Sequence, residues 1–157
     1  MKTQVWAIGK TSEQYLQKGC AIYEQRLKHY LPFEFTIIPD VRQAGKLSAS
    51  QLKQKEAELI FKQLRPDDQL VLLDEKGKTY TSEALAKRMD KWQQMSKRRL
   101  VFLIGGAYGF DESLYERADA QLSLSAMTFS HQMIRLFLLE QLYRAMTILR
   151  NEPYHNP

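Results

Sequence analysis

The chain has 157 residues, of which 44% are apolar and 26% charged, a balance that fits one globular domain over residues 1–157 with a substantial core. No apolar run approaches the roughly 20 residues that span a bilayer, and the first residues lack the apolar segment of a secretory signal. We therefore expect no membrane contact. The single cysteine makes a reducing cytoplasm the default, and the net charge of +5 favours a polyanionic partner, nucleic acid first.

The first part of the chain predicts a strand, a helix and a second strand. Residues 4–8 form a short apolar run, and from Ser12, a candidate N-cap, apolar residues recur at helical spacing until Pro32. Residues 33–38 are rich in β-forming side chains and indicate the second strand. Cys20 lies in the helical pattern; as the single cysteine it permits no internal disulfide, and we expect it in the core.

The middle of the chain continues this alternation. Residues 40–47 are basic and poor in large apolar groups, which indicates a mobile loop. This loop is either a solvated connection or an arm that touches RNA. The other elements expected here are a helix over residues 48–64 capped by Ser48, a buried strand over residues 69–74, and a helix from Thr81 or Ser82 to about Gln94.

Residues 100–150 hold the most informative pattern. The apolar run at 100–104 ends in a loop with glycines at 105, 106 and 109, which indicates a buried strand leading to a close backbone approach. A shorter strand is expected over residues 120–124, and a helix over residues 132–149. Strands that alternate with helices predict an α/β fold with a mostly parallel sheet flanked by helices.

The last predicted helix carries more apolar surface than one neighbour covers. One apolar stripe runs from Ile134 to Leu149, and residues such as Met133, Leu136 and Tyr143 widen it. A helix that is apolar on nearly all sides is buried on more than one side. We therefore predict that it packs against the sheet and also against a second copy of the chain, in a homodimer.

The glycine loop predicts a small-ligand site without a common nucleotide motif. Its late position and G-G-x-x-G spacing differ from a dinucleotide-binding G-x-G-x-x-G, and the P-loop pattern is absent. Ligands of parallel α/β sheets bind outside the carboxyl ends of strands, which here are residues 73–74, 104–106 and 124–126. The three scattered histidines and the single cysteine give no metal-ligating pattern, so we expect no metal.

His131 and Arg135 are candidate catalytic residues. They lie four residues apart at the start of the last predicted helix, so they share one face. The pattern leaves two interpretations of His131 open, a functional imidazole or a side chain that only bonds a loop carbonyl.

Four segments of the second half together resemble one protein family. They are Leu-Ile-Gly-Gly-Ala-Tyr-Gly at 103–109, Leu-Ser-Leu-Ser-Ala-Met-Thr-Phe-Ser-His at 122–131, Arg135 followed by Glu-Gln-Leu-Tyr-Arg-Ala at 140–145, and Asn-Glu-Pro-Tyr-His at 151–155. With these segments the chain resembles, over essentially its full length, the RlmH family. This family comprises bacterial methyltransferases of the SPOUT class that modify N3 of a pseudouridine in large-subunit (23S) ribosomal RNA.

The resemblance implies a fold, a cofactor and partners. The expected fold is a trefoil-knotted α/β domain, and the expected cofactor is S-adenosylmethionine. The expected assembly is a homodimer, and the expected substrate is ribosomal RNA within a ribosomal particle. Two alternatives remain, namely a SPOUT methyltransferase that acts on tRNA or on another rRNA site, and a catalytically silent RNA-binding dimer.

The resemblance also implies the cofactor contacts, and the residue types suggest the catalytic and substrate roles beside them. His131 is expected to accept a proton or position the base, and Arg135 to stabilise an imide anion or hold a phosphate. The family often has Leu-Pro before the histidine, where this chain has Phe129-Ser130. It often has a basic residue after the Tyr-His pair, where this chain has Asn156. The expected cofactor contacts are Leu73, Gly106, Ser125, Ala126, Met127, Thr128, Phe129 and Ser130, and the expected substrate contacts are Tyr154 and His155.

The length of the last helix separates its two functional ends. A helix of about 18 residues is roughly 27 Å long, so the loop before it and the tail after it do not meet in one subunit unless the tail folds back. Antiparallel pairing of two such helices would bring the tail of one chain towards the loop of the other. We therefore expect the tail to complete the RNA site of the partner.

Overall fold

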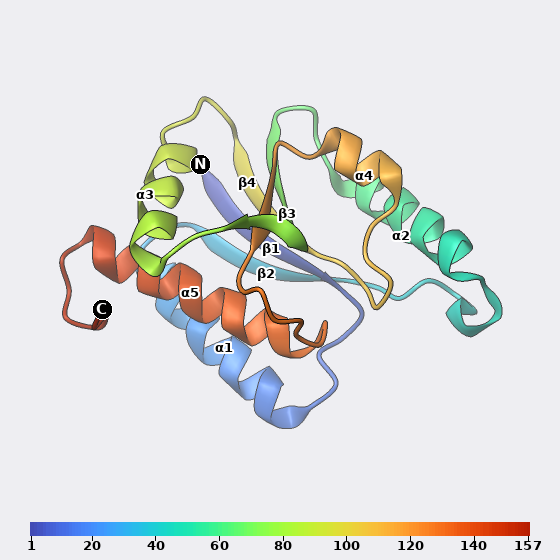
Figure 1. The fold of residues 1–157 in the computed structure, drawn as a ribbon, viewed down its shortest axis with the longest axis horizontal. Coiled ribbons are helices and arrows are strands. Elements are labelled where there is room, and N and C mark those ends of the chain that lie inside the picture. The colour runs from blue at the N-terminus through green and yellow to red at the C-terminus, as the bar shows by residue number, and fades with distance from the viewer.

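The computed structural model describes all residues 1–157 and consists of five strands, five α-helices and one 3₁₀ turn (Figure 1). The polar stretch after the glycine loop contains a short helix that the sequence does not predict. In chain order the elements are β1 (Lys2–Ile8), α1 (Gln14–Lys28), β2 (Phe33–Ile38), η1 (Ala44–Lys46), α2 (Ala49–Gln63), β3 (Asp68–Thr79), α3 (Ser82–Gln93), β4 (Arg99–Ile104), α4 (Glu112–Arg117), β5 (Ala120–Ser123) and α5 (Met133–Leu149).

The five strands form one sheet in the order β2-β1-β4-β3-β5, and every neighbouring pair is parallel. The predicted α/β fold with a parallel sheet flanked by helices is therefore confirmed. Because the strands are parallel, the carboxyl ends of β3, β4 and β5 lie at the same edge of the sheet. The trefoil knot implied by the family resemblance stays a prediction.

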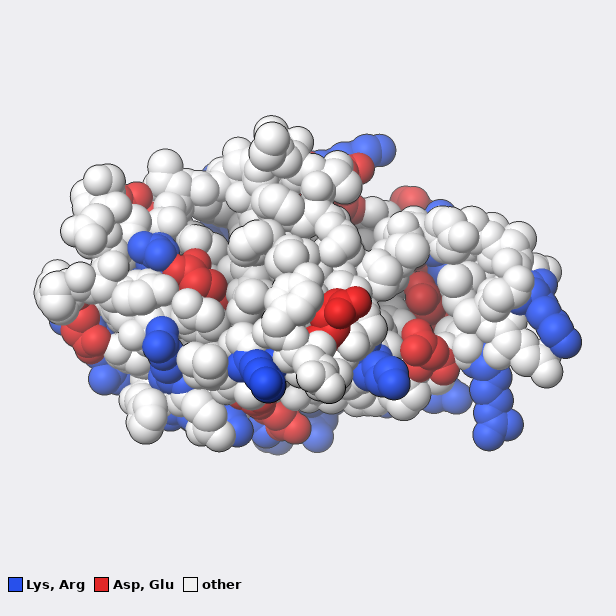
Figure 2. Space-filling view, turned by 90° about the horizontal axis from the view of Figure 1, so that it is seen from below, with Lys and Arg blue, Asp and Glu red and all other residues white.

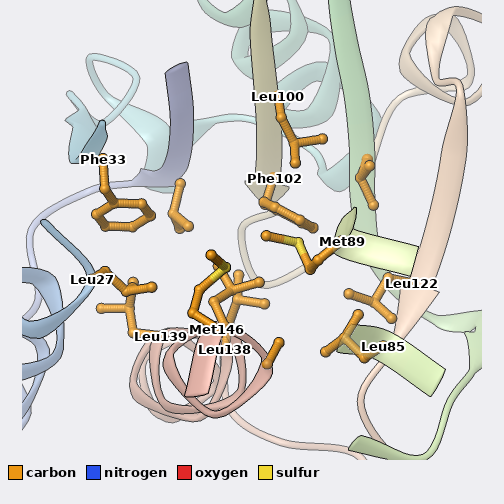
Figure 3. Packing of buried hydrophobic residues seen from close by; sticks show 14 of the residues in the cluster. Leu27, Phe33, Leu85, Met89, Leu100, Phe102, Leu122, Leu138, Leu139 and Met146 are labelled. Atoms are coloured by element: carbon orange, nitrogen blue, oxygen red, sulfur yellow. The ribbon is translucent and has the colours of Figure 1, made fainter. Parts of the chain in front are cut away.

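Helices cover both faces of the sheet and create two hydrophobic cores. Successive residues of a strand point to opposite faces, so Val5 of β1 joins one core and Trp6 joins the other. The larger core lies between the sheet and α1, α3 and α5, where Phe102 meets Met89 and Leu138 (Figure 3). The smaller core lies under α2 and α4, on the other side of the sheet in Figure 1.

Local capping explains where most of the helices begin. Ser48 caps α2 in a capping box and Thr81 caps α3, as the sequence predicts. Ser12 was predicted to cap α1, but this was wrong: Glu13 is the N-cap and makes no side-chain capping bond. The Ser12 N–H instead donates to Gln132 Oε1 at 2.9 Å, which ties the segment after β1 to the start of α5.

Strand β3 is longer than the sequence predicts. The predicted strand stops at Asp74, but β3 continues to Thr79 and its register against β5 shifts after Leu73. At Gly77 the two backbones are so close that an added Cβ would lie 2.8 Å from Leu122 N. Residues 74–77 form no pairs with β5, and such an irregularity bends a strand locally.

Helices α1 and α5 pack together and leave apolar side chains exposed. Leu138 and Leu139 of α5 are fully buried, whereas Phe137 is 40% exposed, and Tyr15 and Ile22 of α1 are 59% and 51% exposed. Seen from below, on the side of α1, uncharged atoms fill the upper middle of the surface, and acidic and basic side chains are scattered over its lower half (Figure 2). A second copy of the chain would cover such a surface, and the homodimer stays a prediction. None of the helices has the length and apolar character needed to cross a membrane.

Candidate functional site

A pocket of about 520 Å³ lies at the carboxyl ends of β3, β4 and β5. Its walls are residues 73–76 at the register shift of β3, residues 104–110 at and after the end of β4, and residues 122–125 and 127–131 at and after the end of β5, with side chains from α4 and α5. This is the edge at which parallel α/β sheets bind ligands. The volume falls in the range that encloses a nucleoside-sized molecule.

Hydroxyl groups hold the loop between β5 and α5 in shape. Ser123 Oγ donates to Ser125 O at 2.8 Å, and Ser125 Oγ accepts from Met127 N–H at 3.0 Å. Thr128 Oγ1 donates to Glu75 Oε2 at 2.8 Å, which joins the loop to the register shift of β3. The loop is therefore ordered by its own polar side chains.

The departure from Leu-Pro at Phe129-Ser130 has a local structural basis. Phe129 packs on Phe137 of α5 with ring centroids 4.9 Å apart. Ser130 Oγ accepts from Met133 N–H at 3.0 Å and satisfies one of the free amides at the start of α5. A proline at residue 130 would have no side-chain acceptor for this bond. In this chain a serine cap and an aromatic contact hold the end of the loop.

Carboxylates outnumber cationic side chains in the pocket wall. Asp74 and Glu75 line the pocket, and Lys76 is its only Lys or Arg. Tyr115 donates its hydroxyl to Asp74 Oδ2, and burial followed by this bond raises the pKa of Tyr115, which keeps it a donor. A cationic ligand with hydroxyl groups fits this wall better than an anion does. No group of three or more His, Cys, Asp or Glu side chains is placed to hold a metal ion.

The two glycines after β4 make room for side chains inside the protein. A Cβ on Gly105 would lie 3.0 Å from the ring of Phe110, and a Cβ on Gly106 would lie 2.7 Å from Glu56 Oε2. From the sequence alone, the glycine at residue 106 is expected to let a ligand approach the backbone. The structure adds another reason, because the Glu56 carboxyl occupies the space of a side chain. A substitution at residue 106 therefore disturbs the loop even without a ligand.

The structure brings most of the predicted cofactor contacts to this pocket. His131 also lines it, two residues before α5 begins, whereas Ala126 is exposed in the same loop and does not line the pocket. The contacts themselves stay predictions. The predicted cofactor residues that line the pocket are Leu73, Gly106, Ser125, Met127, Thr128, Phe129 and Ser130.

Arg135 lies outside the pocket, and its position differs from the predicted contact with an imide or a phosphate. Its side chain is 0% exposed. The guanidinium donates to Ile8 O at 2.8 Å, to Gly9 O at 2.7 Å and to Thr11 Oγ1 at 3.1 Å. Its Nε–H donates to His131 O at 3.1 Å. Because these bonds hold the guanidinium away from solvent, we replace its catalytic assignment by a positioning role beside His131.

Tyr154 and His155 form a second cluster, on the tail that folds back over α5. The Tyr154 hydroxyl donates to Glu140 Oε1 at 3.0 Å, and Arg144 Cζ lies 4.7 Å from the centre of the Tyr154 ring. His155 bonds Glu83 Oε1 through Nε2 at 2.8 Å and Arg144 through Nδ1 at 3.1 Å. None of these residues lines the pocket. The predicted cofactor and substrate residues therefore lie apart within one chain.

Sequence reasoning missed several polar groups at both places. The rule on strand ends leads to Asp74, but the register shift that also exposes Glu75 to the pocket has no sequence pattern. Tyr115 comes from α4, a helix that was not predicted. Glu140 and Arg144 form an ion pair four residues apart, in which Arg144 Nε and Nη2 both donate to Glu140 Oε1. Such pairs are common on exposed helix faces, so only the folded tail marks these residues as part of a cluster.

Comparisons with known proteins agree with this architecture. A family model described as "Predicted SPOUT methyltransferase" matches residues 1–155. Similar proteins come from Cytophaga hutchinsonii and Parabacteroides distasonis, each 53% identical over 156 residues, and from Christiangramia forsetii, 51% identical over 156 residues. Each is named "Ribosomal RNA large subunit methyltransferase H". The alignments cover 99% of this chain and 100%, 99% and 99% of the three relatives.

Proposed function

The chain belongs to the SPOUT methyltransferase family, and we propose that it transfers a methyl group from S-adenosylmethionine to N3 of a pseudouridine in large-subunit ribosomal RNA. The shared name of the relatives supports ribosomal RNA as the substrate. The net charge of +5 agrees with a polyanionic partner. The cofactor and the N3 position rest on the resemblance to the RlmH family. The cytoplasm, where ribosomes are made in bacteria, is the expected compartment.

One observation carries the proposal: segments far apart in the sequence line one pocket at the strand ends. S-adenosylmethionine has an apolar adenine face, ribose hydroxyls and two cationic groups. Leu73 and Ile134 offer apolar surface in this pocket, and the carboxylates of Asp74 and Glu75 are suited to hydroxyl and ammonium donors. The residues present therefore fit the cofactor.

His131 is the pocket residue best suited to the nitrogen that receives the methyl group. When bound, S-adenosylmethionine supplies an electrophilic methyl group on its sulfonium. The N3 of pseudouridine carries a proton that must leave for its lone pair to attack. An imidazole in the same pocket can accept that proton or orient the imide. Arg135 supports this role, because its Nε–H holds the His131 carbonyl.

We also propose a homodimer in which each RNA site is shared. The exposed Phe137 and Ile22 give a second copy an apolar surface to cover. The cluster of Tyr154, His155 and Arg144 lies away from its own pocket, and an antiparallel pairing of two α5 helices would bring it towards the pocket of the partner. Its guanidinium and aromatic ring suit phosphate and base contacts.

Mass spectrometric mapping of rRNA from a deletion strain tests the reaction. The expected result is the loss of one methyl mark on a large-subunit pseudouridine, restored by the wild-type gene and not by His131→Ala. If the lost mark lies instead in tRNA or at another rRNA site, that site is the substrate in place of the proposed pseudouridine. No lost mark, together with retained RNA binding, would identify a silent RNA-binding dimer.

Two inactive variants test the shared site. Gly106→Val disables the pocket loop, and a chain truncated after Asn151 lacks the tail cluster. A mixed dimer contains one intact pocket that faces one intact tail, so activity should return to about half per mixed dimer. No recovery after proven subunit exchange would contradict sharing between chains.

A further inference from the structure

Glu56 of α2 places a carboxyl directly behind the wall of the pocket. Its residue is 8% exposed, and its Oε2 lies 2.7 Å from the point that a Cβ on Gly106 would occupy. Gly106 lines the pocket and Glu56 does not. The carboxyl is therefore separated from the pocket by the backbone of one residue that has no side chain.

Nothing in the protein compensates the charge of this carboxyl. The Glu56 side chain makes no hydrogen bond and no ion pair, although a mostly buried acid is normally paired, and its carboxyl oxygens keep some contact with solvent. The charged group that acts on it most is Asp40, which follows β2 and has the same sign. Burial, and then Asp40, raise the pKa of Glu56 to about 7. Without a ligand, Glu56 is therefore only about half ionised at pH 7.

The other charged groups around Glu56 are already engaged or exposed. Arg135 of α5 interacts electrostatically with Asp40, and its guanidinium donates a hydrogen bond to Gly9 O after β1. On α2 itself, Lys53 acts on Asp111 at the start of α4. Lys10, which follows β1, is exposed, and Asp40 is the only charged group that shifts the pKa of Glu56. A cation that enters the pocket would be the missing partner.

The two forms of the proposed cofactor differ in that charge. S-adenosylmethionine carries a fixed positive charge on sulfur, whereas its demethylated product, S-adenosylhomocysteine, is a neutral sulfide. We propose that Glu56 is a positioning residue that acts through the backbone of Gly106 and favours the cationic methyl donor over the neutral product. This inference rests on the proposed use of S-adenosylmethionine. By binding the neutral product less well than the donor, the site with Glu56 behind Gly106 favours product release.

Linkage gives the inference a measurable consequence. A cation near Glu56 favours its ionised form, so binding of the donor must release protons from a partly protonated group. With a pKa of about 7, Glu56 holds about half a proton at pH 7, which is the largest release expected. The neutral product lacks the sulfonium and should release much less. If the bound donor lowers the pKa of Glu56 by about one, donor affinity should rise about tenfold between low and high pH.

Calorimetric titration of the full-length protein at pH 7 measures this release. The heats of binding of S-adenosylmethionine and S-adenosylhomocysteine are compared in PIPES and imidazole buffers, whose ionisation enthalpies differ, to obtain protons released per ligand. The wild type should release more protons with the donor than with the product. Glu56→Gln should abolish that difference, while Glu58→Gln, an exposed acid on the same helix, should leave it unchanged.

A second variant keeps the carboxyl and moves its titration. Asp40→Asn removes the like charge and should shift the pH midpoint of the donor-to-product affinity ratio downwards in a chain that retains Glu56. Equal proton release for both ligands in the wild type would overturn the inference while leaving the proposed function intact. A folded wild type that binds neither ligand would overturn the proposed cofactor and this inference together.

Discussion

Replacing Glu56 by glutamine should remove a pH-dependent loss of stability. Burial and Asp40 raise the pKa of Glu56 from 4.5 to about 7 in the folded protein. The folded state therefore binds the proton more tightly than the unfolded state does. The contribution of this group to stability is fully present below pH 4.5 and is lost as the pH rises through about 7.

The size of the effect follows from the two pKa values. Their difference corresponds to about 3 kcal/mol of unfolding free energy once Glu56 is ionised. Most of this loss falls between pH 5 and pH 8, and it amounts to about 2 kcal/mol over that interval. The glutamine amide of the variant carries no charge at any of these pH values, so the variant should gain on the wild type by this amount.

Urea unfolding at pH 5, 6, 7 and 8, with protein concentration fixed, measures this difference. The buried Trp6 and Trp92 report on the two cores of the protein by fluorescence. Glu58→Gln serves as the matched control, because the Glu58 side chain is 63% exposed. A variant-minus-wild-type difference that stays constant within about 0.5 kcal/mol from pH 5 to pH 8 would refute the reasoning.

Three further substitutions test other parts of the site. Arg135→Met should lower the unfolding free energy by about 3 kcal/mol, because buried carbonyls lose their partners. The salt dependence of RNA binding should stay that of the wild type, and a smaller salt slope would show that Arg135 contacts a phosphate after all. Gly106→Ala should weaken cofactor binding in calorimetry much less when Glu56→Ala is also present, and equal effects in both backgrounds would assign the glycine to the ligand alone. Tyr115→Phe should weaken cofactor binding about tenfold by releasing Asp74, and an unchanged affinity would exclude that carboxylate from the contact.

Features written into short stretches of sequence could be predicted from it. Apolar runs of strand length, such as residues 100–104, separated by helical patterns, were sufficient for the parallel α/β fold, because periodicity reports which faces are buried. The caps Ser48 and Thr81 act within three residues and were likewise predictable. The segments around the pocket were found because parallel strands end at one edge of the sheet, and the residue-level contacts came from the family resemblance.

Tertiary structure alone decided what lies between these segments. Arg135 looks like a functional cation beside His131, but its partner Gly9 is 126 residues away, and only the folded chain shows that it is buried. Glu56 carries no motif, and its position behind Gly106 depends on how α2 packs on the end of the sheet. A local pattern records the conformation and burial of its own residues. The charge, space and hydrogen bonds that one segment leaves for another are set only when distant parts of the chain are brought together.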